Sequence, residues 1–300
     1  MPELPEVETT VKQLRKVILD KKIIKVWCDN FKTVRRVKED KTVFADFKYF
    51  KNYVIGAKIK GIKRRGKNIL IGLSDNKLIL VHQKLTGHLL VGAWRLEGNK
   101  WQARKEGLLR EKINLFIHLM FYLSDGLMLA LSDVRKFAKV LYGKEKNILN
   151  LPEIKNLGPE PLEKNFTFEK FKEIIGKFRG KIKQVLMNQE AIAGIGNIYS
   201  DEILWRSKIN PFRLSQNLGL EEEKRVYLAA KEILKKAIKL RGESISDWRD
   251  ARGEKGGYDN IRKVYQREGE KCPRCGSLIQ RKKISGRSAH FCPSCQSLSR

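Results

Sequence analysis

The chain has 300 residues, and its 63 lysines and arginines exceed its 34 aspartates and glutamates, giving a formal net charge of +29. No apolar run reaches the roughly eighteen residues of a membrane span, and the N-terminus shows no secretory or transit pattern. The cations are spread over the whole length, which indicates a polyanion such as nucleic acid as the partner. A lysine-rich thermophile surface is the alternative, but that usually carries matching glutamates.

The first secondary-structure element predicted is an amphipathic helix over residues 5–19. Pro5 suits the first turn of a helix, and Glu6 complements its positive end. Val7 and Val11 begin an apolar stripe on one face. The helix therefore follows directly on an acidic tip that is stiffened by proline.

From Lys22 to Leu141 the apolar period changes to two, which predicts short strands separated by Gly, Asp or Asn. A polar excursion at 93–112 interrupts them and is expected to be a long hairpin loop. The pattern is typical of an antiparallel β-sandwich. The predicted strands are 22–27, 42–47, 57–65, 68–73, 77–82, 115–123 and 127–133.

The second half of the chain has a different pattern. Residues 143–166 contain three prolines and neither period, which predicts a linker. Residues 241–271 are rich in glycine and charge and are expected to be a mobile loop. Helices are predicted between them, at 167–178, 181–190, 197–207 and 221–240.

Five cysteines occur, and four of them are arranged as two C-x2-C pairs separated by sixteen residues. This spacing is typical of a tetrahedral zinc site. Four thiolates leave no open position for a substrate, so the expected role is structural. Disulfides are less favoured, because no signal peptide is present and the unpaired Cys28 would be unsuited to an oxidising compartment. Cys28 itself is expected to be a small core residue. The predicted ligands are Cys272, Cys275, Cys292 and Cys295.

The opening residues, MPELPEVE, are also suited to a role in catalysis. Removal of Met1 would make Pro2 a terminal secondary amine, and α-amino groups titrate near ~8. Such an amine can form an iminium with a sugar aldehyde. Glu3 and Glu6 are close enough in sequence to move protons around the attacked carbon. A plain Pro–Glu helix cap is the commoner reading of this feature by itself.

Four further blocks, in order, resemble those of formamidopyrimidine-DNA glycosylases, the bacterial base-excision enzymes that remove oxidised purines. They are RRGKN around Lys67, LGPEPL at 157–162, IKQVLMNQEAIAGIGNIYSDEILWRSKINP from Ile182, and the segment from Val264 that contains both cysteine pairs. Together with MPELPEVE they run the length of the chain.

The resemblance implies a bifunctional DNA glycosylase and AP lyase that excises 8-oxoguanine and formamidopyrimidines from duplex DNA. In the family, the N-terminal proline attacks the anomeric carbon, the base leaves, and β,δ-elimination follows from a Schiff base. By position Pro2 is the nucleophile, Glu3 the acid–base group, and Lys67 a catalytic lysine that contacts phosphate. The resemblance also implies one structural Zn²⁺ and damaged double-stranded DNA as the partner. A bacterial cytoplasmic, nucleoid-associated monomer without a nucleotide cofactor is expected.

Further DNA contacts are implied in the second half of the chain. The GIGN stretch at 194–197 lacks a full dinucleotide-binding pattern, and its glycines are better suited to letting the backbone approach a phosphate. Asn197 and Lys183 are expected to contact phosphate. Arg287, at the tip of the finger hairpin, is expected to grip DNA and assist catalysis.

The family flips the damaged nucleotide out of the duplex and fills the hole with side chains from two loops. Arg135 and Phe137 match two of these side chains, while Leu85 stands where methionine is usual. Lys84 replaces a frequent glycine, and the Leu85 difference puts the preferred lesion in question. His82 is expected to touch phosphate, although a core histidine is the commoner case. The loop 241–265 aligns with the family's base-capping loop, with no individual contacts assigned.

The predicted fold class is therefore α+β and multidomain. The alternatives to the main function are an endonuclease VIII-like preference for oxidised pyrimidines and a non-catalytic zinc-finger DNA-binding protein. The predicted domains are a helix with a β-sandwich (1–145), a linker (146–165), a helix–two-turn–helix domain (166–265) and a zinc finger (266–300).

Overall fold

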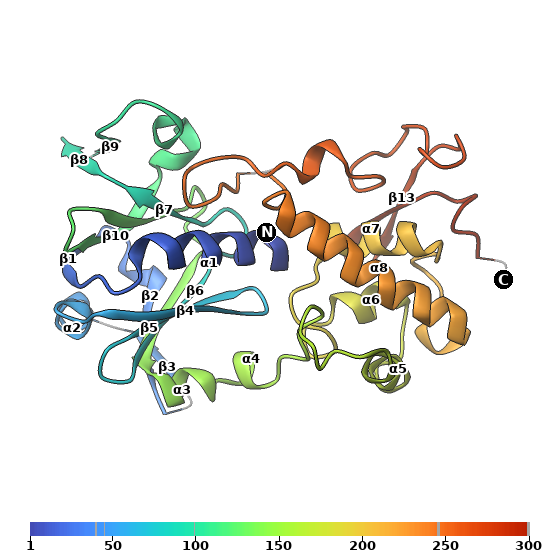
Figure 1. Ribbon diagram of the computed structural model, residues 1–300, viewed down its shortest axis with the longest axis horizontal. Helices are drawn as coiled ribbons and strands as arrows, with labels where there is room; N and C mark the ends of the chain where they lie inside the picture. Colours follow the sequence, from blue (N-terminus) through green and yellow to red (C-terminus); the bar gives the residue numbers. More distant parts are fainter. Residues whose placement is uncertain (40, 45, 99, 245–246, 299–300) are drawn as a thin grey trace. The chain divides into compact units, whose positions relative to one another are not determined.

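Two β-sheets dominate the first half of the computed structural model, which describes residues 1–39, 41–44, 46–98, 100–244 and 247–298 (Figure 1). The strand orders are β1-β10-β11-β7 and β3-β2-β12-β6-β5-β4. The first sheet comprises β1 (Ile23–Cys28), β7 (His88–Gly92), β10 (Ile117–Leu123) and β11 (Met128–Ser132). The second comprises β2 (Val34–Lys38), β3 (Lys41–Phe44), β4 (Ile59–Arg65), β5 (Asn68–Leu73), β6 (Lys77–His82) and β12 (Lys139–Lys144).

The pairing confirms the predicted sandwich with two differences. The strands β2, β7 and β12 were not predicted, and one pair of strands is parallel. Neighbouring strands are antiparallel except β2 and β12, which run parallel. The predicted helix is present as α1 (Leu4–Ile18), and its apolar stripe, including Val7 and Val11, is fully buried in the core. Burial of this stripe fixes α1 against the sheets.

A short helix, α2 (Phe47–Val54), was not predicted, because its first residue was assigned to a strand. Asp46 caps it by accepting a hydrogen bond from the Lys48 amide at 3.0 Å. Phe50 and Val54 are one turn apart and both lie in the core. The helical period covers too few residues to be distinguished from a strand in the sequence alone.

The polar excursion is more ordered than a loop. It forms the hairpin of β8 (Trp94–Glu97) and β9 (Lys100–Ala103), followed by the 3-10 turns η2 (Leu108–Arg110) and η3 (Lys112–Leu115). Trp94 and Trp101 are buried in a small apolar cluster of their own. Trp101 meets the edge of Trp27 on β1 at 5.2 Å between ring centroids. The two indoles therefore anchor an otherwise hydrophilic segment.

The second half of the chain contains the predicted helices and a terminal hairpin. The helix α7 packs against α6, α8 and β14, and nearly all of its side chains are buried. A helix that is covered on all sides acts as the centre of its unit. The elements are α5 (Phe168–Lys177), α6 (Ile182–Met187), α7 (Asn197–Ser207), α8 (Leu220–Lys239), β13 (Gln280–Ile284), β14 (Arg287–Phe291) and the 3-10 turns η4 (Ser215–Asn217) and η5 (Tyr258–Asn260).

The contacts divide the chain into two compact units. Unit 1 is 1–156 with 241–257, and unit 2 is 157–240 with 258–300. The predicted linker contains two short helices of unit 1, α3 (Glu145–Leu149) and α4 (Pro152–Lys155). The domain boundaries drawn from the sequence remain predictions. Within the described ranges, no helix is both long and apolar enough to cross a membrane.

The segment 241–257 differs from the mobile loop that its composition suggested. Gln13 on α1 donates to Asp250 Oδ2 at 2.7 Å and accepts from the Ala251 amide at 2.8 Å. Trp248 and Asp250 are buried. Residues 245 and 246, which also fall in the predicted capping loop, lie outside the described residues. A few buried anchors thus tie this glycine-rich stretch to the sandwich.

A buried charge network joins α6, α7 and β14 in unit 2. The Lys183 ammonium forms an ion pair with Asp201 and donates to the Ser288 carbonyl at 2.9 Å. The other Asp201 oxygen accepts from the His290 amide at 2.9 Å and from its Nδ1 at 3.0 Å. Removal of this one carboxylate would break the buried ion pair with Lys183 and both hydrogen bonds from His290.

We expect Asp201→Ala to lower the free energy of unfolding by about 3 kcal/mol, because it breaks a buried ion pair. Urea denaturation followed by circular dichroism measures this loss. Asp125→Ala is the control, since that carboxylate pairs with Lys21 at the surface and should contribute less than about 1 kcal/mol. Equal losses in the two variants would contradict the importance given to the network.

Candidate functional site

The acidic tip of the chain is held in a defined conformation. Met1 is exposed, whereas Pro2 and Glu3 are buried, Glu3 with 2% of its surface accessible. Glu3 is the N-cap of α1, and its amide donates to Glu6 Oε2 at 2.7 Å. This backbone-to-carboxylate bond is half of a capping box. It fixes the backbone immediately after the predicted nucleophile.

Glu6 also connects the tip to the segment 241–257. Its second oxygen, Oε1, accepts from the Glu243 amide at 2.8 Å. The neighbouring Gly242 has φ +78°, and a Cβ built on it would lie 2.5 Å from Glu6 Oε1. Glycine is therefore required for both its conformation and its lack of a side chain. Sequence reasoning treated Glu6 as a possible proton carrier and missed this positioning role, although the Glu-x-x-Glu spacing was a usable signal.

Lys67 lies in the two-residue turn that joins β4 to β5. The turn begins with Gly66 at φ +56°, and Lys67 is 6% exposed. Two contacts set the direction of α1 along β4. Arg15, late in the helix, donates to the Ile62 carbonyl at 2.9 Å.

Arg64, two residues further along β4, donates to Glu8 Oε2, near the start of the helix, at 2.8 Å. The first turn of α1 therefore extends toward the Lys67 turn. Figure 1 shows the N-terminus and the tip of the β4–β5 hairpin at the same end of unit 1. The structure thus brings Pro2, Glu3 and Lys67 to one end of the sandwich.

His82 ends β6 and is surrounded by cations. It lies opposite Lys139 in the β12 ladder, and its Nδ1 accepts from the Lys84 amide at 3.0 Å. Burial first, and then the charges of Lys84, Lys67 and Lys139, lower the pKa of His82 from 6.5 to about 3. The ring is therefore neutral at physiological pH with its proton on Nε2, where it can donate to an anion.

Two loops of unit 1 carry the predicted hole-filling residues. Leu85 is 38% exposed and Phe137 is 52% exposed, which is unusual for side chains of this size. The Arg135 guanidinium lies over the Phe137 ring, 4.8 Å from its centroid. The structure thus brings Arg135 and Phe137 together, and both loops present apolar tips to solvent.

Asp133 joins these loops. Its Oδ1 accepts from the Thr86 hydroxyl, and its Oδ2 accepts from the Ala138 amide at 2.7 Å. The Arg135 amide lies 3.3 Å from both Thr86 Oγ1 and Asp133 Oδ1. Because Asp133 is buried, this carboxylate determines the shape of both loops. Sequence reasoning did not identify it.

The departure noted at Lys84 has a structural meaning. Lys84 adopts φ +55°, a conformation that favours glycine, and Lys136 in the other loop adopts φ +56°. The hydrogen bond from the Lys84 amide to His82 Nδ1 helps to hold this conformation. A lysine at this position adds a cation next to the exposed Leu85 while the turn is retained.

In unit 2, Asn197 is the first residue of α7 and follows Gly196, where the positive end of the helix favours an anion. Lys183 departs from expectation, because its side chain is 1% exposed and already paired with Asp201. Its predicted phosphate contact remains a prediction. Arg287 is exposed beyond a turn in which Ser285 and Gly286 both have positive φ. Lys183 and Arg287 border one small cavity of about 190 Å³.

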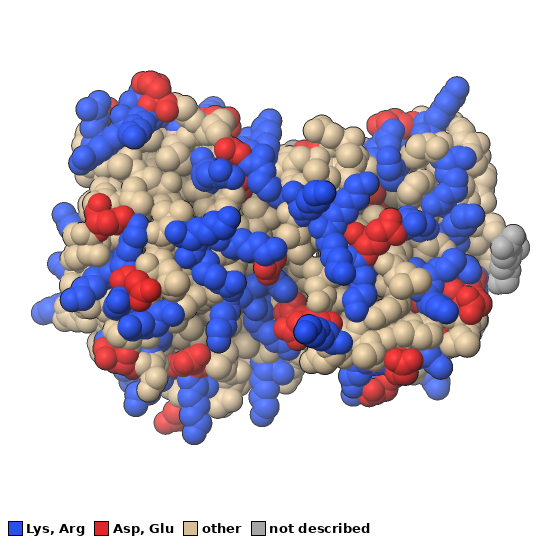
Figure 2. Space-filling model, viewed as in Figure 1, with Lys and Arg blue, Asp and Glu red and all other residues tan. Residues whose placement is uncertain are grey.

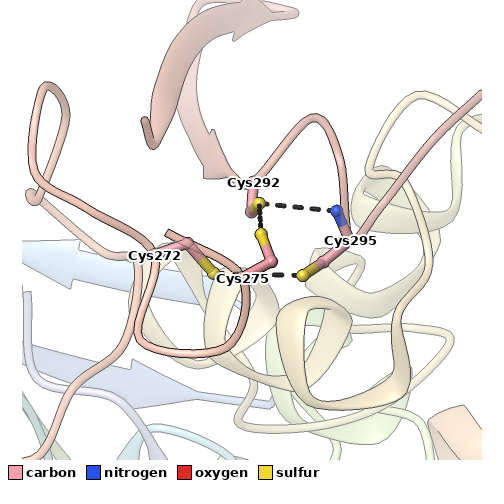
Figure 3. A group of neighbouring side chains, drawn as sticks. All are labelled: Cys272, Cys275, Cys292 and Cys295. Carbon is pink, nitrogen blue, oxygen red and sulfur yellow. Dashed lines mark hydrogen bonds between the residues drawn. The ribbon is translucent and has the colours of Figure 1, made fainter. Parts of the chain in front are cut away.

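The four paired cysteines converge as predicted (Figure 3). Their Sγ atoms lie within 4.8 Å of one another, including separations of 3.5 Å for Cys275–Cys292 and 4.0 Å for Cys272–Cys295. Tetrahedral zinc with Zn–S bonds of about 2.3 Å requires sulfurs about 3.8 Å apart. The Trp205 indole donates to Cys272 Sγ at 3.4 Å, which favours a thiolate. The donor set therefore fits one structural zinc.

Cys28 lies apart from this cluster, in the core of the sandwich. Burial raises the pKa of its thiol to about 12, so it is protonated at physiological pH.

Lysines and arginines cover much of the face shown in Figure 2, with acidic groups more scattered. Exposed positive charge is therefore abundant on this face.

Three family models match the chain. The formamidopyrimidine-DNA glycosylase N-terminal domain matches residues 1–140, the formamidopyrimidine-DNA glycosylase H2TH domain matches 157–249, and the zinc finger found in FPG and IleRS matches 269–298. The last match and the clustered thiols together establish one structural zinc site.

Curated relatives are similar over almost their entire length. The chain is 38% identical to the formamidopyrimidine-DNA glycosylase of Pelotomaculum thermopropionicum and 36% identical to that of Desulforamulus reducens, covering 99% of each chain in both cases. Solved structures agree. A Lactococcus lactis FPG mutant bound to Fapy-dG DNA has a TM-score of 0.83 at 34% identity, covering 99% of this chain and 100% of the other.

A second solved structure, the L. lactis Fpg with abasic-site DNA, has the same TM-score and identity and covers 98% and 99% of the two chains.

We expect Gly242→Ala to displace Glu6 and to reduce the order of the N-terminal tip. Gly56→Ala is a matched control, because Gly56 has a similar φ of +82° but open space around its Cβ position. Both variants carry the same backbone strain, so an extra loss of stability of about 1–3 kcal/mol in Gly242→Ala isolates the clash. Equal melting temperatures would contradict the positioning role of Glu6.

His82 gives a pH-dependent prediction. Its folded pKa, about 3, lies below the unfolded value of 6.5, so the unfolded state binds the proton first as the pH falls. Stability should therefore be lost from pH 6.5 downward, by up to about 1.4 kcal/mol per pH unit. Denaturation at several pH values should show a shallower loss in His82→Gln. Parallel profiles for the two proteins would contradict the depressed pKa.

Proposed function

The chain belongs to the formamidopyrimidine-DNA glycosylase family, and from this premise we propose how its residues excise oxidised purines from duplex DNA. The enzyme is a DNA glycosylase for oxidised purines, with the AP lyase activity that is part of the family. The observation that carries the residue assignment is the buried Pro2–Glu3 tip, which Glu6 orders and which lies at the same end of unit 1 as Lys67.

The amine of Pro2, exposed by removal of Met1, attacks C1′ of the damaged nucleotide and the base leaves with a proton. The ring oxygen then accepts a proton as the sugar opens, which gives a Schiff base between the amine and C1′. Glu3 moves these protons and assists loss of the C2′ proton, so that β-elimination releases the 3′ phosphate. Loss of the C4′ proton in the δ-elimination that follows releases the 5′ phosphate. Lys67 stabilises the negative charge of the adjacent phosphate.

The remaining predicted residues hold the DNA. Neutral His82 donates through Nε2 to a phosphate, and the N-terminus of α7 at Asn197 suits another. Arg287 presents a fork of donors from the hairpin tip. Leu85, Arg135 and Phe137 occupy the space that the flipped nucleotide leaves, Arg135 facing the orphaned base.

Leu85 is the feature that bears on lesion choice. It is apolar and similar in volume to methionine, so filling of the hole should be retained. Leucine also favours, weakly, the preference for oxidised pyrimidines. The curated relatives are named formamidopyrimidine-DNA glycosylases, and formamidopyrimidines are oxidised purines. These names support a preference for oxidised purines over this alternative. We further propose that the protein acts as a monomer, because all assigned groups come from one chain. We also propose that it works at the bacterial nucleoid and needs no nucleotide cofactor.

The test compares Glu3→Gln with the wild type on duplexes that carry 8-oxoguanine, thymine glycol or an abasic site. Wild-type protein should excise 8-oxoguanine in preference and be trapped covalently by borohydride. Glu3→Gln should release the base at least about 100-fold more slowly, yet still be trapped on abasic DNA, because its amine is intact.

Asp125→Asn is the control, since it removes a carboxylate of unit 1 that pairs with Lys21 at the surface. It should excise the base at close to the wild-type rate. Native base release by Glu3→Gln would remove the acid–base assignment, and a preference for thymine glycol would favour the pyrimidine alternative.

A further inference from the structure

A groove of about 620 Å³ lies beside the two loops of unit 1. Its lining includes the apolar tips Leu85 and Phe137 and no carboxylate. Five cationic side chains also line it: Lys32, Arg35, Lys84, Lys136 and Lys139. The lining does not include Pro2, Glu3 or Lys67, and none of the five cationic side chains has been assigned a DNA contact above.

Most of this positive charge is uncompensated. Lys32 and Lys136 are exposed, and neither forms an ion pair within the described part of the chain. Arg35 lies over the Phe44 ring at 5.2 Å, a contact that orients the guanidinium without neutralising it. Lys139 is the exception, with Glu153 at 2.6 Å. A concave surface of this kind concentrates anions.

The groove is also fixed in shape. The buried Asp133 carboxylate connects the two loops that form one of its walls. Lys84 and Lys136 immediately adjoin Leu85 and Phe137, and both adopt the same left-handed conformation. Lys84 and Lys136 therefore place a positive charge next to each of the two apolar tips. When Leu85 or Phe137 inserts between two bases, the sugar–phosphate backbone next to those bases comes within reach of the lysines beside the inserted residue.

We propose that this groove binds consecutive phosphodiester groups of a DNA strand that passes the tips of Leu85 and Phe137. The proposal rests on the proposed function for the orientation of the two tips, but it does not involve the chemistry at Pro2. Either strand of the duplex could supply the phosphates. The groove adds sequence-independent affinity and holds the duplex while the lesion is extruded.

The experiment measures binding to undamaged duplex DNA between 50 and 200 mM salt by fluorescence anisotropy. Each phosphate contact adds about 0.9 to the slope of log K against log salt. Lys32→Gln with Lys136→Gln should therefore lower the slope by about 1.8. Over this salt range, the double variant should lose about tenfold less affinity than the wild type. Glutamine removes the charge but keeps a polar side chain, and both positions are exposed, so folding should be unaffected.

Lys48→Gln with Lys51→Gln is the control, since these exposed lysines on α2 do not line the groove. It removes the same net charge and should leave the slope close to the wild-type value. An unchanged slope in the groove variant, or an equal fall in the control, would overturn the proposal.

Neutral methylphosphonate linkages placed on one strand at a time identify the strand. At the contacted positions they should weaken wild-type binding and leave the groove variant unaffected. If no position on either strand shows this difference, the groove holds no backbone. Borohydride trapping is measured separately, so absent trapping with a lowered slope would contradict the catalytic assignment and leave the groove supported.

Discussion

The arrangement of the site depends on one buried carboxylate, that of Glu6. One oxygen accepts the amide of Glu3 and the other accepts the amide of Glu243, so a single side chain connects the start of α1 to a segment distant in sequence. Without these bonds the terminal residues would be an exposed, frayed end, as chain termini usually are. Gly242 makes the contact possible, because any side chain there would collide with Glu6. The backbone of Glu3 is thereby fixed at the start of α1.

Charge is divided between two functions. The chain is strongly cationic, and its exposed lysines and arginines suit a polyanionic duplex. The carboxylates of Glu6 and Asp133, in contrast, hold the backbone, and the proposed mechanism uses Glu3 to move protons. His82 stays neutral among lysines, so that it can donate a hydrogen bond without adding a further charge.

Local patterns predicted much of this protein. The 3.6-residue period gave α1, the period of two gave the sandwich, and the cysteine spacing gave the zinc site. Features that depend on long-range contacts were not predicted. Asp133 and Gly242 act on residues distant in sequence, so no local pattern marks them. The buried ion pair of Lys183 with Asp201 was also not predicted. The short helix α2 covers too few residues for its period to be recognised.

The central claim is that the nucleophile is the secondary amine of Pro2. The most direct measurement is to reduce the protein–DNA adduct on 8-oxoguanine duplex with borohydride, digest both components, and locate the added sugar by mass spectrometry. The account predicts a modified N-terminal peptide that begins at Pro2 and lacks Met1. An adduct on Lys67 or another lysine, or on a peptide that retains Met1, would contradict it.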